Sequence, residues 1–119
     1  MLELFIDTKQ LEKDIYLISL NGILNNETSG TLLTVFRDLF VRKIWKFVVD
    51  LSKVNYMGSP GIGLFISFID SLDEHKGAIV FVNPKPTVKE AFKIFKLSNF
   101  YSITKNLKSA VDELKNLTR

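Results

Sequence analysis

The segment that decides the fold reads VNYMGSPGIG and spans residues 54–63. It follows a nearly continuous apolar run, typical of a buried strand, and opens an apolar pattern with helical spacing. Ser59 is expected to be the N-cap of that helix, because its hydroxyl oxygen can accept a hydrogen bond from the first free amides. Pro60 would take the first helical position, where a missing N–H costs nothing. Gly61 and Gly63 remove side chains from the first turn. The segment therefore predicts a rigid helix tip that presents one hydroxyl to an approaching surface.

Strand and helix patterns alternate on both sides of this tip. Runs typical of strands lie at residues 2–6, 15–20, 45–51, 78–82 and 101–103, with a charged stretch suited to a turn between the first two. Apolar residues recur at helical spacing in residues 32–40, 62–72, 88–95 and 107–114. This alternation implies crossover connections. We predict a single α/β domain over residues 1–119, with a mixed, mostly parallel sheet of four to five strands covered by about four helices.

Length and composition narrow the function classes. The chain has 119 residues, 46% of them hydrophobic, which suits one domain with one sizeable core. It has no cysteine and a formal net charge of only +3, which gives direct nucleic-acid binding little support. The start lacks the pattern of a signal peptide, and no apolar stretch reaches the roughly 18 residues of a membrane span. We expect a cytoplasmic protein.

Several stretches together resemble a known signature. VVDLS at residues 48–52 is followed, after a short spacer, by YMGSPGIG at residues 56–63. GIL at residues 22–24, the glycine Gly77 before the next strand, and KIFKL at residues 93–97 extend the likeness over nearly the whole chain. The pattern is similar to that of the anti-sigma factor antagonists, which belong to the STAS domain family.

The resemblance implies a regulatory binding domain and not an enzyme. In that family the serine that matches Ser59 is phosphorylated by a partner serine kinase of the GHKL type, which is itself the anti-sigma factor. The unphosphorylated form binds the kinase and frees the sigma factor, and the phosphorylated form lets go. No cofactor, metal or catalytic residue is implied. The expected partner-binding residues surround the tip: Asn25, Gly58, Ser59, Pro60, Gly61 and Ile62.

The chain departs from the family pattern at three positions. Gly58 stands where an aspartate usually precedes the serine, and Pro60 stands where a small residue usually follows it. Asn25 replaces an aspartate that is common after the Gly-x-Leu turn. The missing carboxylate beside the acceptor hydroxyl predicts an antagonist that is phosphorylated slowly or not at all. Some members of the family are never phosphorylated and act as scaffolds or as transporter accessory subunits, which is the alternative function.

Other interpretations of the tip remain open from the residues alone. Ser59 can be a plain helix cap, and a cap can also be a phosphate acceptor. The glycines at 58, 61 and 63 could cradle a nucleotide phosphate, but their spacing fits neither the dinucleotide fingerprint nor the P-loop. Asp50 is expected to make a local hydrogen bond, because no acid–base partner lies at a readable spacing. His75 is the only histidine, so it predicts no zinc cluster.

Two further patterns concern surfaces. Lysines at 85, 89, 93 and 96 recur every three or four residues, which favours a solvated helix face and leaves a dock for an acidic partner as the alternative. Leu64 and Phe68 fall outside the apolar stripe formed by Ile62, Ile66 and Ile69. We expect Leu64 and Phe68 to pack under a neighbouring helix; otherwise they would border the tip as a partner-facing patch.

Overall fold

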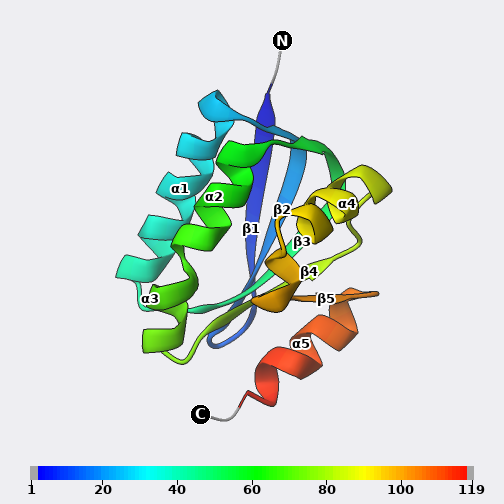
Figure 1. Cartoon of the computed structure of the whole chain (residues 1–119). Helices are drawn as coiled ribbons and strands as arrows, with labels where there is room; N and C mark the ends of the chain where they lie inside the picture. The colour runs from blue at the N-terminus through cyan, green and yellow to red at the C-terminus, as the bar shows by residue number, and fades with distance from the viewer. Residues whose placement is uncertain (1–2, 118–119) are drawn as a thin grey trace.

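The computed structural model describes residues 3–117, which form a five-stranded sheet with helices on both faces (Figure 1). The elements follow in the order β1 (Leu4–Glu12), β2 (Ile15–Leu24), α1 (Asn26–Val41), β3 (Lys46–Met57), α2 (Ser59–Ser67), α3 (Ile69–Glu74), β4 (Ala78–Val82), α4 (Pro86–Ile94), a 3₁₀ turn (Leu97–Asn99), β5 (Ser102–Thr104) and α5 (Leu107–Lys115). The predicted α/β class with a mixed, mostly parallel sheet is confirmed.

The strands lie in sequence order across the sheet. β1 and β2 form an antiparallel hairpin, and β2, β3, β4 and β5 pair in parallel. The hairpin is longer than expected: β1 continues through the charged stretch, and the turn shrinks to Lys13 and Asp14. Charged side chains are normal there because β1 is an edge strand, where they discourage pairing with another chain. Leu2, part of the predicted first strand, lies outside the described residues.

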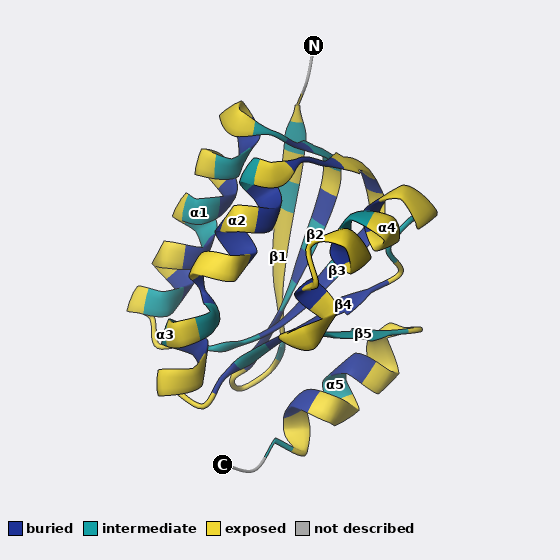
Figure 2. Cartoon of the chain, in the orientation of Figure 1, coloured by how far each residue is buried: buried dark blue, intermediate teal, exposed yellow. Residues whose placement is uncertain are grey.

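Alternating side chains of the central strands build a core on each face of the sheet. One core packs beneath α1 to α4 and includes Phe47, Val49 and Phe81. The other takes the intervening residues, such as Val48 and Val80, and is covered by α5. Figure 2 shows the buried stripe of each helix turned inward and the exposed stripe turned outward. The larger core positions the tip, because α2 rests on it.

The second predicted helix is divided in two. Phe68 is both the C-cap of α2 and the N-cap of α3. Its ring centroid lies 4.8 Å from that of Phe36 in α1, and Leu64 is also buried. The expectation of packing under a neighbouring helix is therefore confirmed for Phe68, and Leu64 is buried in the same core. Ile66, expected on the core stripe, is instead 44% exposed.

β3 runs much further than its predicted end near residue 51. Its pairing with β2 slips between Ser19 and Asn21, and the strand continues to Met57. Asp50 therefore lies within the strand and not at its end. The amide of Ser52 donates a hydrogen bond of 2.9 Å to Asp50 Oδ1, which is the local role expected for this carboxylate. The longer strand carries the chain directly into the tip.

Candidate functional site

The tip lies where β2 and β3 end side by side. Leu24 pairs with Met57 in the parallel register, and the amide of Gly58 donates a hydrogen bond of 3.0 Å to the carbonyl of Leu24. Each strand then leads into a helix, β2 into α1 and β3 into α2. The two helices start close together at the upper end of the view in Figure 1. Asn25 follows Leu24 directly, so the sheet register brings it beside the Gly58 turn. We refer to this region, from Leu24 and Asn25 to the first turn of α2, as the tip.

Asn25 is held by helix capping. Its side-chain oxygen accepts hydrogen bonds from the amides of Glu27 (2.9 Å) and Thr28 (3.0 Å). The Thr28 hydroxyl lies 2.9 Å from the Asn25 amide, which donates to it and completes a capping box. The prediction that this polar stretch caps a helix is confirmed. The same bonds fix the Asn25 side chain and leave its oxygen committed to α1.

α2 begins one residue earlier than predicted. Gly58, and not Ser59, is the N-cap, because its carbonyl accepts the first helical hydrogen bonds from the amides of Gly61 (3.0 Å) and Ile62 (3.2 Å). Ser59 is the first residue of the helix and Pro60 the second. The Ser59 side chain is exposed and makes no cap hydrogen bond. The hydroxyl therefore has no structural role at this helix end and faces solvent.

Tyr56 covers Gly58. A Cβ atom placed on Gly58 would come within 2.9 Å of Tyr56 Oη and 3.0 Å of its Cε2 atom. Gly58 is buried as a result, while the Tyr56 side chain remains 55% exposed. The space that a side chain at position 58 would enter is thus occupied by the phenol ring of Tyr56. Nothing in the residue pattern alone predicted this contact.

Gly61 and Ile62 face the interior of the domain. A Cβ atom on Gly61 would lie 3.0 Å from Cβ of Leu24 and 3.1 Å from Cγ of Met57, so this glycine lets α2 pack closely on the strand ends. Ile62 is only 2% exposed and belongs to the core. The expected placement of Ile62 at the surface rim of the tip is wrong. The space beside Gly58 and Gly61 is thus filled, whereas a Cβ atom on Gly63 would meet no atom within 4 Å.

The surface around Ser59 comes from other residues. Ser59, Gly63 and Ile66 lie at positions i, i+4 and i+7 of α2 and share one helix face, and all three are exposed. Tyr56 borders the same tip through its contact with Gly58. The first turn of α2 carries no acidic side chain. The tip therefore offers a hydroxyl flanked by apolar surface, and sequence reasoning missed Tyr56 and Ile66.

A buried tyrosine, Tyr101, holds α2 in place from the core side. The hydroxyl of Tyr101 donates a hydrogen bond to the carbonyl of Phe65. Burial, with a smaller contribution from Asp73, raises the pKa of Tyr101 well above its usual range. The hydroxyl therefore stays protonated as a donor. This bond and the packing of Phe65 against Phe36 and Phe81 hold α2 rigid behind the exposed face.

The remaining features of residues 3–117 indicate neither a metal site nor a membrane-spanning helix. Within that range, no group of three or more histidine, cysteine, aspartate or glutamate side chains could hold a metal ion. None of the described helices is long and apolar enough to cross a membrane. His75 stacks on Trp45 with ring centroids 3.7 Å apart, and its Nδ1 lies 2.8 Å from the carbonyl of Ser71, so it has a structural role at the end of α3.

Comparison with known proteins identifies the fold and the family. The model of the STAS domain matches residues 6–113. The chain belongs to the STAS domain family. The fold resembles the anti-sigma factor antagonist SpoIIAA in its unphosphorylated form, with a TM-score of 0.82, 17% identity, and coverage of 97% of this chain and 100% of the other.

Two further structures share this fold. An anti-sigma factor antagonist from Mycobacterium paratuberculosis has a TM-score of 0.85 and 17% identity, with 96% of each chain covered. The phosphorylated form of SpoIIAA, described as a Bacillus cell fate determinant, has a TM-score of 0.72 and 17% identity, covering 92% of this chain and 98% of the other. At these identities the likeness shows the fold alone.

Proposed function

We propose that this STAS domain is an anti-sigma factor antagonist that regulates transcription in the cytoplasm by partner switching. Its tip docks a serine-kinase anti-sigma factor of the GHKL type, and phosphorylation of Ser59 releases that partner. The domain itself is a binding module and not an enzyme. The observation that supports the proposal most directly is the position of Ser59. Its hydroxyl is exposed on the first turn of a rigid helix and does not cap that helix.

The chemistry of the switch follows from this place. The kinase transfers the γ-phosphoryl group of ATP to Ser59 Oγ, ADP leaves, and the hydroxyl proton passes to a base of the kinase. The product adds nearly two negative charges at the positive end of α2. The first turn has no acidic side chain to repel it. Helix α2 therefore tolerates the phosphate, and the added charge and bulk act on the partner.

The docking surface has both an anchor and a switch. Tyr56 at the tip and Ile66 one turn further along the exposed face of α2 are exposed apolar side chains, and buried apolar anchors dominate most protein interfaces. Ser59 and Asn25 contribute polar groups at the rim, and the partly exposed Pro60 contributes apolar surface beside them. Gly58, Gly61 and Ile62 act indirectly, because they set the backbone path of the tip from inside. A phosphate on Ser59 would lie on the same helix face as Ile66 and prevent close approach there.

A second function rests on Gly58. The carboxylate that the family usually places before the serine is absent, and Tyr56 lies over the position. This favours a scaffold or transporter accessory subunit that binds constitutively and is never phosphorylated. The two functions share the docking surface and differ in whether Ser59 accepts a phosphate.

Phosphate mapping separates them. The purified chain is incubated with ATP and each GHKL-type serine kinase of the same genome, and modified residues are located by peptide mass spectrometry. We expect one phosphate, on Ser59, that is lost in Ser59→Ala and retained in Ser109→Ala, a control at an exposed serine of α5 on the other side of the sheet. A complex that forms with no phosphate on Ser59 would favour the scaffold.

A further inference from the structure

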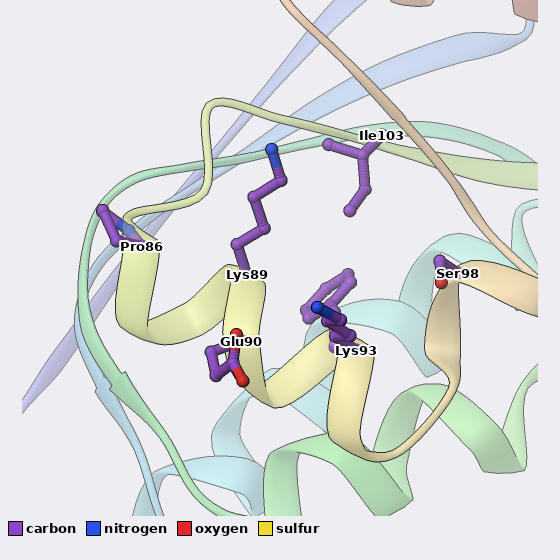
Figure 3. Close-up of a pocket in the computed structure, with 7 residues that line it drawn as sticks. Pro86, Lys89, Glu90, Lys93, Ser98 and Ile103 are labelled. Atoms are coloured by element: carbon purple, nitrogen blue, oxygen red, sulfur yellow. The ribbon is translucent and has the colours of Figure 1, made fainter.

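Two adjoining hollows lie between α4 and the segment that leads through β5. The first has a volume of about 480 Å³, with Lys89 and Lys93 on one wall and Ser98 and Ile103 on the other (Figure 3). The second, of about 400 Å³, shares Lys89 and Ile103 and extends to Lys105. Together they form one elongated depression, which we refer to as the α4–β5 trough. Its second half lies at the carboxyl ends of β4 and β5, the edge where open α/β sheets usually bind ligands.

The trough carries unbalanced positive charge. Lys89, Lys93 and Lys105 contribute three ammonium groups, and Glu90 is the one carboxylate among the lining residues. None of the ion pairs in residues 3–117 involves any of these four side chains. Lys89 and Lys93 are also an i, i+4 pair of like charge, which destabilises a helix slightly. An anionic ligand between them would relieve this repulsion.

The floor of the trough is apolar. The buried Phe92 lines the first hollow and packs against Phe81, and the partly exposed Ile103 lines both hollows. Figure 3 shows the side chains of Lys89 and Ile103 directed into the space between α4 and the chain leading through β5, which is open on one side. An enclosed pocket buries most of a small ligand's surface, and an open trough does not. Its length and its apolar floor under cationic side chains fit an extended peptide better than a small anion.

We propose that the α4–β5 trough binds an extended acidic peptide segment of a protein partner. In an extended peptide, successive side chains point to opposite sides. Apolar residues at alternate positions would face Phe92 and Ile103, and carboxylates between them would face the ammonium groups of Lys89, Lys93 and Lys105. This site is separate from the tip and does not depend on phosphorylation of Ser59.

Fluorescence anisotropy tests the proposal on the full chain. The probe is a fluorescein-labelled eight-residue peptide of alternating glutamate and leucine, and the control peptide has glutamine in place of each glutamate. The variant Lys89→Glu/Lys93→Glu is compared with Lys9→Glu/Lys13→Glu, which changes the net charge equally at exposed lysines of the β1–β2 hairpin. Thermal melting of each variant shows that it is folded.

We expect the acidic peptide to bind the wild type and to bind Lys89→Glu/Lys93→Glu about tenfold more weakly, because two exposed ion pairs become repulsive. Two controls distinguish binding at the trough from a general effect of net charge. The variant Lys9→Glu/Lys13→Glu should bind the acidic peptide within about twofold of the wild-type affinity, and the glutamine peptide should bind the wild type poorly. The proposal is overturned if both variants weaken binding equally, or if the glutamine peptide binds as tightly as the acidic one. It is also overturned if citrate, a small anion, displaces the labelled peptide from the wild type as effectively as the unlabelled acidic peptide does.

Discussion

Replacing Gly58 by aspartate restores the carboxylate that the family usually places beside the acceptor serine. The backbone at Gly58 has φ −84° and ψ 179°, an extended conformation that any residue adopts, so the substitution introduces no backbone strain. The obstacle is Tyr56, whose hydroxyl oxygen lies 2.9 Å from the new Cβ position. Because the Tyr56 side chain is already 55% exposed, its ring can swing aside at little cost.

The effect on stability is small and favourable. α2 has no side-chain cap, and an aspartate in place of an N-cap glycine is worth a few tenths of a kcal/mol. The helix dipole adds about 0.3–1 kcal/mol, and moving the tyrosine takes part of this back. We expect a net gain of about 0.5 kcal/mol, which raises Tm by roughly 2–3 °C in a chain of this size.

The effect on phosphorylation is larger. A carboxylate beside the hydroxyl can orient it and help accept its proton, but the kinase supplies most of the catalysis. We therefore expect Gly58→Asp to speed modification of Ser59 by less than about 100-fold, the lower end of general acid–base contributions. The assay is single-turnover transfer of radioactive phosphate from ATP with the kinase in excess.

Two control variants isolate the charge. Gly58→Asn has the same shape as Gly58→Asp and caps the helix without a charge, and Gly30→Asp places a carboxylate on α1, where the new Cβ meets no atom within 4 Å. Both should be phosphorylated at nearly the rate of the wild type. If asparagine at position 58 is as effective as aspartate, or if a folded Gly58→Asp chain reacts no faster than the wild type, the reasoning is refuted.

Three further predictions concern the framework of the tip. Ile62→Asp should lower the free energy of unfolding, measured in urea, by about 3 kcal/mol or more because it buries a carboxylate. Ile66→Asp should leave Tm nearly unchanged and weaken partner binding, measured by titration calorimetry, at least about tenfold. Gly61→Val should cost about 1–3 kcal/mol in urea unfolding, since the added methyl groups meet side chains already in contact. The raised pKa of Tyr101 means that the folded state holds a proton which the unfolded tyrosine loses near its usual pKa of 10.0, so stability should fall as the pH rises above about 10. Tyr101→Phe should flatten this alkaline loss and cost about 1 kcal/mol at neutral pH, because the hydrogen bond to Phe65 disappears; an unchanged alkaline slope in the variant would contradict the assignment.

The elements of the fold were predictable where local patterns and burial agree. The apolar runs of β3 and β4 and the helical stripes of α1 and α4 are visible in the sequence because both faces, or one full stripe, are buried. The extension of β3 to Met57 was not predictable, since it depends on pairing with β2 after a register shift. The length of β1 was also not predictable from its charged residues, because its second half is held in the sheet by pairing with β2.

The tip shows where residue patterns stop being informative. Ser59 and Gly58 are both acceptable N-caps, and the choice between them depends on the hydrogen bond from Gly58 to Leu24, a contact across the sheet. Ile62 and Ile66 are the same residue type four positions apart, and the rotation of α2 on the core decides that one is buried and the other exposed. Hydrophobicity alone cannot assign them.

The central claim is that phosphorylation of Ser59 releases the partner. The most direct measurement compares the dissociation constants of the kinase anti-sigma factor for the unmodified chain and for a chain carrying phosphoserine at position 59, introduced during synthesis and verified by mass spectrometry. We predict that the phosphate weakens binding at least about 100-fold, which corresponds to roughly 2.8 kcal/mol. Equal affinities within about twofold, for two chains with the same melting temperature, would contradict the account.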